Sequence, residues 1–275
     1  MLVTSKQMIL DAQKGGYAIG CFNTSDLEIT KAIIVAAESQ KSPVIVATSE
    51  KAIQFGGLDS LAALIKEEGK KANIPVALHL DHGQSLAMVK RCLGAGYTSV
   101  MIDGSKLPLG ENEALTYQAA VLAHTQDIPC EGELGALGKV GKSESQLTNP
   151  EDVLGFVKHT GVDFLAVSIG SLHGAGENEN LDIELLKKIR AFIDVPLVLH
   201  GGSGVPDQDI RRAVSAGIAK INIDTDIRHE FTKDLREILK EYPKEQDFRE
   251  ILEKVMVKIQ ALVERKIKLF GSANK

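Results

Sequence analysis

Cysteine is scarce in this chain, and its few occurrences lie far apart. The 275 residues contain cysteine only at Cys21, Cys92 and Cys130, and no two of these have a CxxC spacing. A disulfide framework and a zinc site made of thiolates are therefore excluded. A reducing cytoplasm is the simplest setting for such a composition, so we expect a cytoplasmic protein.

An excess of positive charge and a long apolar segment at the N-terminus are also lacking. The chain has 32 Lys and Arg against 37 Asp and Glu, with a net charge of -5 and an isoelectric point near 5.9. Such a charge gives no long-range attraction to nucleic acid or to an anionic membrane. Residues 1–16 include Lys6, Gln7, Asp11 and Lys14, which interrupt any signal peptide or membrane span. We expect neither nucleic acid nor membrane as a partner.

What the chain does contain is a regular alternation of two periodicities. Hydrophobic residues make up 44% and charged residues 25%, which suits a globular protein with a sizeable core. Short apolar runs predict strands at 17–22, 43–47, 75–83, 98–102, 128–134, 163–169, 195–199 and 218–223. Stretches of helical spacing predict a helix before the first strand and one after each of the first seven strands, and helices at 227–239 and 248–269 after the eighth.

This alternation predicts an α/β fold, a single (β/α)8 TIM barrel with extra C-terminal helices, in which residues 1–275 form one domain. A doubly wound open sheet is the second candidate. Against a dinucleotide-binding version of that sheet, no GxGxxG motif follows the first strand. The segment 135–149 has neither periodicity and predicts a long loop.

Polar residues follow the predicted strands where each of them ends. In a barrel these ends share one rim, and that rim is where barrel enzymes carry out their chemistry. It would receive Asn23, Thr48, Ser49, Asp81, His82, Asp103, Glu133, His173, His200 and residues 222–225.

Histidines at three separate strand ends suggest a metal site. A lone histidine is more often structural than a ligand. His82, His173 and His200, however, would converge on one rim, and three neutral imidazoles with an open fourth position form a catalytic zinc site. Cobalt or manganese would also accept these ligands. His79 lies deeper on its strand and is either core or a neighbour of the ligands.

Residues 200–204 (HGGSG) and 222–225 (NIDT) predict a phosphate site at the ends of the seventh and eighth strands. Glycine lets backbone N–H groups approach an anion, and the hydroxyls of Ser203 and Thr225 add donors. A GGSG sequence by itself is also typical of a flexible turn.

Together, these motifs resemble the class II, metal-dependent ketose-bisphosphate aldolases. The resemblance runs from residue 21 to residue 273 and includes HLDHG at 79–83, EGELG at 131–135, SLHG at 171–174, LHGGSG at 199–204 and KINIDTD at 220–226. It implies that His82, His173 and His200 hold a catalytic zinc ion and that Asp81 is the acid/base acting on the aldehyde oxygen. Asp103 and Glu133 match a second or alternate metal position.

The resemblance also implies the substrate and its contacts. Dihydroxyacetone phosphate would contact Gly174, Gly201, Gly202, Ser203, Asn222, Ile223, Asp224 and Thr225, with a sodium or potassium ion near Gly174 and Gly201. Asn23 and Ser49 on the same rim are further predicted substrate contacts. A homodimer or homotetramer is implied.

The implied reaction is reversible cleavage of fructose 1,6-bisphosphate to dihydroxyacetone phosphate and glyceraldehyde 3-phosphate. Zinc would polarise the ketone and stabilise the enediolate, while Asp81 takes the C4 hydroxyl proton. The competing route needs a Schiff-base lysine, but the sixth strand has none and Lys220 lies deeper than Asn222. Alternatives are tagatose bisphosphate, a deoxy-keto-gluconate phosphate, or a non-catalytic phosphosugar-binding barrel.

The chain departs from the family pattern in the loop after the fifth strand. Family members often carry Gly-Gly and paired acids there, whereas Glu144 is the sole carboxylate in residues 137–145. Glu144 would exchange the dihydroxyacetone phosphate proton when the loop closes, or it is a solvated loop charge.

Overall fold

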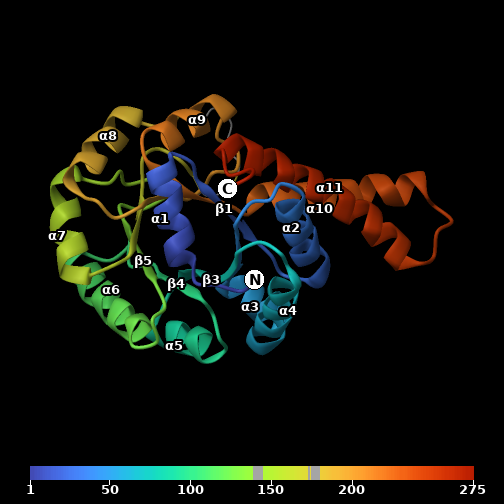
Figure 1. Cartoon of the computed structure of the whole chain (residues 1–275), viewed down its shortest axis with the longest axis horizontal. Coiled ribbons are helices and arrows are strands. Elements are labelled where there is room, and N and C mark those ends of the chain that lie inside the picture. Colours follow the sequence, from blue (N-terminus) through green and yellow to red (C-terminus); the bar gives the residue numbers. More distant parts are fainter. Residues whose placement is uncertain (139–144, 173, 175–179) are drawn as a thin grey trace.

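The computed structural model describes residues 1–138, 145–172, 174 and 180–275. Eight parallel strands pair in sequence order, and β8 pairs with β1, so the sheet closes into a barrel. Helices surround this barrel on the outside (Figure 1). The predicted (β/α)8 barrel is confirmed, and the open doubly wound sheet is wrong.

Each predicted apolar run contains one strand. The strands are β1 Ile19–Asn23, β2 Val44–Ser49, β3 Val76–Gly83, β4 Ser99–Ile102, β5 Cys130–Leu134, β6 Phe164–Val167, β7 Leu197–Leu199 and β8 Ile218–Ile223. Proline stands directly before β2, β3, β5 and β7, at Pro43, Pro75, Pro129 and Pro196. Proline has no N–H to donate to a strand pair, so it marks where these strands begin.

Several of the helices begin after a residue whose side chain caps them. They are α1 Ser5–Gly15, α2 Leu27–Ser39, α3 Glu50–Gly56, α4 Leu58–Lys71, α5 Leu86–Gly94, α6 Leu109–His124, α7 Pro150–Thr160, α8 Ile183–Phe192, α9 Asp207–Ser215, α10 Thr225–Glu241 and α11 Phe248–Phe270. Asp26, Ser49, Ser85, Asn149 and Asp182 each accept a backbone N–H in the first turn of the helix that follows. Apolar periodicity does not predict α3, because seven residues make only two turns.

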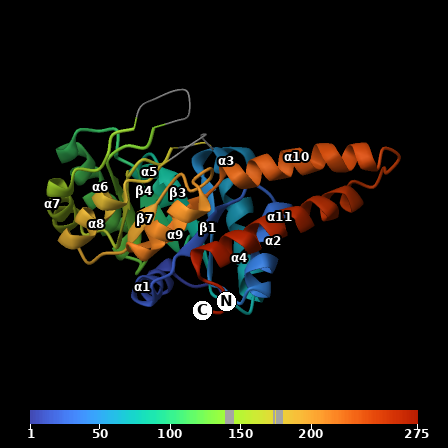
Figure 2. The same ribbon diagram turned by 90° about the horizontal axis from the view of Figure 1, so that it is seen from above.

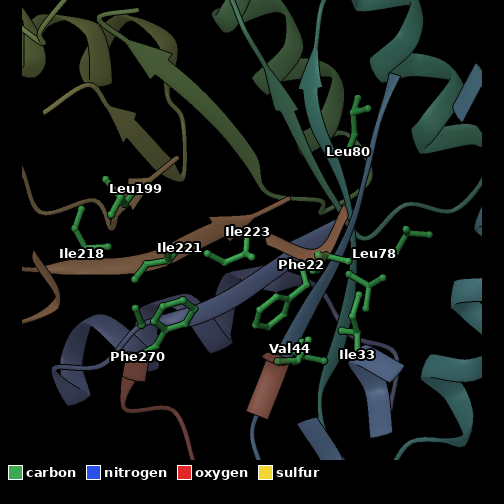
Figure 3. Close-up of a cluster of buried hydrophobic side chains, with 14 of the residues drawn as sticks. Phe22, Ile33, Val44, Leu78, Leu80, Leu199, Ile218, Ile221, Ile223 and Phe270 are labelled. Atoms are coloured by element: carbon green, nitrogen blue, oxygen red, sulfur yellow. The ribbon is translucent and has the colours of Figure 1, made fainter. Parts of the chain in front are cut away.

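Two apolar layers lie on either side of the barrel strands. The outward side chains of Phe22, Leu78 and Ile223 pack toward the helices, where Ile33 of α2 and Phe270 of α11 meet them (Figure 3). The rings of Phe22 and Phe270 stack with their centroids 6.5 Å apart. These contacts hold the helices against the sheet.

The inner layer closes one end of the barrel. Met8, Ile9 and Ala12 of α1 join a second buried cluster of strand residues, which includes Ile19 and Phe164 at the starts of β1 and β6. The helix α1 contacts β1, β3 and β8. With α1 at the amino ends of the strands, access to the interior is from their carboxyl ends.

The last two helices form a hairpin that extends away from the barrel (Figure 2). α11 packs against α10 and α2, and it buries Ile251, Val255, Ile259, Leu262, Val263 and Ile267. The predicted extra C-terminal helices are therefore present. Among the described residues, no helix combines the length and apolar composition that a bilayer span requires.

Candidate active site

A cavity of about 800 Å³ opens at the carboxyl ends of the strands. Predicted site residues in its wall are Asn23, Ser49, Asp81, His82, Asp103, Glu133, Gly174, His200, Gly201, Ser203, Asn222, Asp224 and Thr225. His173 and Glu144 lie outside the described residues, so their predicted roles stay predictions. The structure thus places side chains from strands far apart in sequence around one space.

A backbone irregularity at the end of β3 turns both Asp81 and His82 toward this cavity. Side chains alternate along a strand, and a regular β3 would place the two residues on opposite faces. His82 instead has a left-handed φ of +49°, and the β3–β4 register shifts between Leu80 and Gly83. A non-glycine residue in this conformation costs about 1–3 kcal/mol, and such strain is found mainly at functional sites.

The imidazoles of His82 and His200 converge. His82 Nε2 lies 2.9 Å from His200 Nδ1. The other nitrogen of each ring faces a carboxylate: His82 Nδ1 donates to Asp103 Oδ2 at 2.9 Å, and His200 Nε2 donates to Glu131 Oε1 at 2.7 Å. Carboxylates that bind the far N–H of a histidine in this way orient metal ligands, and they leave the two facing nitrogens for a shared ion.

The surroundings of these imidazoles are strongly acidic. Burial alone would lower the pKa of His82, but the carboxylates of Asp81, Asp103 and Glu133 raise it to about 10. Burial and the neighbouring Asp103 raise the pKa of Glu133 to about 8. Both groups therefore keep their proton to a higher pH than usual, as expected of an acidic pocket that favours an added positive charge.

Two sets of donor atoms in this pocket fit a metal ion. The ligand atoms of Asp81, His82 and His200 lie within 4.8 Å of one another, and so do those of His82, Asp103 and Glu133. Imidazole nitrogen with carboxylate oxygen suits zinc, and cobalt and manganese as well. The two sets share His82, so one ion could occupy either position. The first set contains two of the three predicted zinc ligands, His82 and His200, with Asp81 beside them, and the second set contains Asp103 and Glu133; the ligand roles themselves stay predictions.

Asp81 is held in place by two amides. Its Oδ2 accepts from Asn23 Nδ2 at 2.7 Å, and its Oδ1 accepts from Asn222 Nδ2 at 2.8 Å. Burial acts to raise the pKa of Asp81, but His82, His200 and Lys220 lower it below its ordinary value. An ionised, oriented carboxylate facing the cavity can take a proton from a substrate hydroxyl.

The ends of β7 and β8 form the part of the cavity suited to an anion. Gly201 has a φ of +67°, and a Cβ there would clash with the carbonyl oxygen of Leu172. Ser203 Oγ accepts from Asp226 N at 3.1 Å, which ties this loop to the first turn of α10. Unpaired N–H groups and the dipole at a helix N-terminus favour a phosphate.

Two predicted substrate contacts lie behind this wall. Gly202 is buried and donates its N–H to Asn222 O at 3.2 Å. The side chain of Ile223 packs in the outer apolar layer (Figure 3), so only its backbone could contact a substrate in the cavity.

Sequence reasoning misses several residues at the site. Glu131 binds His200, while Lys51, Lys106 and Arg228 line the cavity. Arg228 binds Asp224 Oδ2 through Nε at 3.0 Å and Thr225 Oγ1 at 3.1 Å. Arg228 is three residues from Thr225 and four from Asp224, and this helical spacing could have predicted the contacts from the sequence. Lys51 lies on α3, the helix that periodicity does not predict.

The remaining histidines lie away from the cavity wall. His79 is fully buried inside the barrel, and its Nδ1 lies 2.8 Å from Ser99 Oγ. His124, His159 and His229 are exposed.

Comparison with known families and proteins identifies a clear relationship. The family model described as fructose-bisphosphate aldolase class-II matches residues 3–275. A fructose-bisphosphate aldolase of Geobacillus stearothermophilus is 41% identical over 284 residues, covering 100% of this chain and 98% of that protein.

Other relatives carry different substrate names. A 6-phospho-5-dehydro-2-deoxy-D-gluconate aldolase of Shouchella clausii is 40% identical and covers 98% of this chain and 94% of its own length. A sulfofructosephosphate aldolase of Alkalicoccus urumqiensis is 38% identical, with 99% and 98% coverage. The crystal structure of the YdjI aldolase from Escherichia coli K12 superposes with a TM-score of 0.90 at 35% identity, covering 100% of this chain and 99% of that one.

Proposed function

The chain belongs to the class II fructose-bisphosphate aldolase family, and from that premise we propose that it reversibly cleaves fructose 1,6-bisphosphate into dihydroxyacetone phosphate and glyceraldehyde 3-phosphate. Membership makes it an aldehyde-lyase of a metal-dependent class. The observation that carries the proposal is the position of Asp81, an oriented carboxylate whose Oδ1 lies 3.9 Å from both His82 Nε2 and His200 Nδ1.

The proposed cofactor is zinc, held by His82 and His200 with His173 as the third ligand. Asp103 and Glu133 would form the second or alternate position with His82, and cobalt or manganese could replace zinc. A sodium or potassium ion is also proposed to bind near Gly174 and Gly201. When bound, a divalent ion polarises the substrate ketone and stabilises the negative charge of the enediolate.

The residues of the chain carry the proton transfers. Asp81 takes the proton from the C4 hydroxyl as the bond between C3 and C4 breaks, which releases C4 as the aldehyde carbon. The electron pair of that bond stays on the three-carbon fragment, and a proton added at C3 yields dihydroxyacetone phosphate. Glu144 is the proposed donor of that proton. In the reverse direction Asp81 returns its proton to the aldehyde oxygen.

The substrate phosphate is proposed to bind where β7 and β8 end. The backbone N–H groups of Gly201, Ser203 and Thr225 would receive it, together with the hydroxyls of Ser203 and Thr225. The Gly202 N–H is already paired with Asn222 O, so Gly202 would contribute by its small size. Asn23, Ser49, Asn222 and Asp224 would orient the sugar hydroxyls.

Initial-rate assays would test the function. We expect the purified protein to cleave fructose 1,6-bisphosphate faster than tagatose 1,6-bisphosphate or 6-phospho-5-dehydro-2-deoxygluconate, to stop after chelation, and to recover with zinc. Faster cleavage of another ketose phosphate would reassign the substrate within the family. Chelator-sensitive sugar binding without turnover would favour a phosphosugar-binding protein, and turnover indifferent to chelator would overturn the metal mechanism.

The same proposal includes the cellular setting. A cytoplasmic enzyme of glycolysis and gluconeogenesis, assembled as a homodimer or homotetramer, fits a fructose-bisphosphate aldolase. Light scattering of the purified chain measures the oligomeric state.

A further inference from the structure

A lysine lies in the barrel interior directly below the cavity, and the proton transfers above do not use it. Lys220 of β8 is fully buried. Its Nζ lies 2.9 Å from Glu131 Oε2 and donates to Asn222 Oδ1 at 2.7 Å. Burial lowers the pKa of Lys220, but Cys21, Glu131 and Asp81 raise it more, so the amine is charged at neutral pH. A charged amine in an ion pair is unsuited to form a Schiff base.

One side of this lysine leads to a proposed metal ligand. Glu131 of β5 contacts Lys220 with Oε2 and His200 with Oε1, the second at 2.7 Å. The side chains of Glu131, Lys220 and His200 are all at most 1% exposed. Lys220 Nζ holds Oε2, so the other oxygen of the same carboxylate, Oε1, is directed at the His200 N–H. A charged or N–H partner on each oxygen fixes the orientation of the Glu131 side chain.

The other side leads to the proposed acid/base. Asn222 receives the Lys220 N–H at its oxygen, which turns its amide nitrogen toward Asp81 Oδ1 at 2.8 Å. Without a donor at that oxygen, the amide of Asn222 could rotate and present its oxygen to the carboxylate of Asp81. Lys220 therefore decides which end of the Asn222 amide faces Asp81.

We infer that Lys220 is a positioning residue that orients His200 through Glu131 and Asp81 through Asn222. Lys220 does not itself line the cavity and is not one of the proposed metal ligands, and it acts through one neighbour on each side, Glu131 and Asn222. This inference rests on the proposed function, because it takes His200 as a zinc ligand and Asp81 as the acid/base. The alternative is a lysine that merely fills the barrel interior and balances one charge.

Zinc affinity distinguishes the two roles without any measurement of turnover. In the Lys220→Met variant, Glu131 loses its cation, and the zinc dissociation constant measured by competition with a chromophoric chelator should rise about 10–100-fold, as for other residues that support metal ligands. The visible absorption band of the cobalt-substituted protein should also shift, because the position of His200 around the ion changes.

A matched control is available in a second buried ion pair. Lys266 of α11 pairs with Asp226 at 2.6 Å and is 8% exposed, but its partner is on α10 rather than in the barrel. Lys266→Met removes a buried charge of the same kind and should leave zinc affinity and the cobalt band unchanged. Equal effects in both variants would indicate a general loss of stability and would overturn the inference.

A double variant in which the charges stay balanced serves as the control for folding. If Lys220→Met does not fold, Lys220→Met with Glu131→Gln removes both charges, and we expect it to fold and still to bind zinc more weakly than the wild type. Wild-type zinc affinity and an unshifted cobalt band in a folded variant would overturn the inference, and so would failure of both variants to fold. A wild-type chain that binds no zinc and cleaves no ketose phosphate would instead overturn the proposed function.

Discussion

Replacing Asp81 with asparagine is the most direct test of the proposed chemistry. The two side chains have nearly the same shape, but asparagine cannot take a proton from the C4 hydroxyl. Loss of a general base typically lowers the rate by about 10²–10⁴, which is about 2.7–5.5 kcal/mol of transition-state stabilisation. We therefore expect kcat of Asp81→Asn to fall by that factor.

The same substitution should leave the protein folded. Asp81 accepts one hydrogen bond from Asn23 and one from Asn222. An asparagine has one carbonyl oxygen and can keep only one of them, while its own amide nitrogen would face the other donor. Loss of a hydrogen bond to a charged group costs about 1.5–3 kcal/mol, which is less than the stability of most domains.

The assay couples the released triose phosphates to NADH oxidation, with zinc content measured on the same samples. Asp163→Asn is a matched control, since Asp163 is also a carboxylate, partly buried, that accepts hydrogen bonds, from Cys130 N and His124. It lies at the amino end of β6, away from the cavity, and should keep wild-type kcat.

Deuterium exchange at C3 of dihydroxyacetone phosphate should continue in Asp81→Asn, because another group carries out that step. If Asp81→Asn keeps its zinc and also keeps more than about a tenth of the wild-type kcat, Asp81 is not the base.

Three further results are expected. Zinc at a free concentration of 100 times its dissociation constant should stabilise the chain by about 2.7 kcal/mol and raise Tm by about 5–10 °C, and an unchanged Tm with added zinc or chelator would contradict the metal site. Gly201→Ala should lower the free energy of unfolding, measured by chemical denaturation, by at least about 1–2 kcal/mol, because alanine is strained at a φ of +67° and its Cβ would meet Leu172. The same variant should have a higher KM. Unchanged stability and unchanged KM would contradict the described loop. Burial acts to raise the pKa of Asp163, but Lys6 and His124 lower it below the usual 3.8, so this carboxylate stabilises the fold above pH 3.8 and less as the pH falls further. Urea midpoints of wild type and Asp163→Asn should therefore differ at pH 7 and approach each other below pH 3.8, and a constant difference would refute this assignment.

The alternation of strands and helices follows from local sequence, because each repeat of strand and helix carries its own period. That alternation also allows an open doubly wound sheet, and the pairing of β8 with β1 that closes the barrel is seen only in the structure. Pro43, Pro75, Pro129 and Pro196 mark strand starts by their chemistry, and Asp26, Ser85 and Asn149 mark helix starts. The list of polar residues at strand ends then places most of the cavity wall. Contacts such as Glu131 with His200 join residues 69 positions apart, and local periodicity carries no information about them.

What the sequence by itself determined is the eight strands, the helices long enough to show a period, and the strand ends at which the polar residues gather, since these depend on periods of a few residues. The tertiary structure decided which face each side chain uses. The left-handed backbone at His82 and the register shift in β3 place Asp81 and His82 in the same cavity, against the alternation that a regular strand would impose. The tertiary structure also decided that Lys220 lies between Glu131 and Asn222, because a closed barrel brings side chains of β5 and β8 together in one interior.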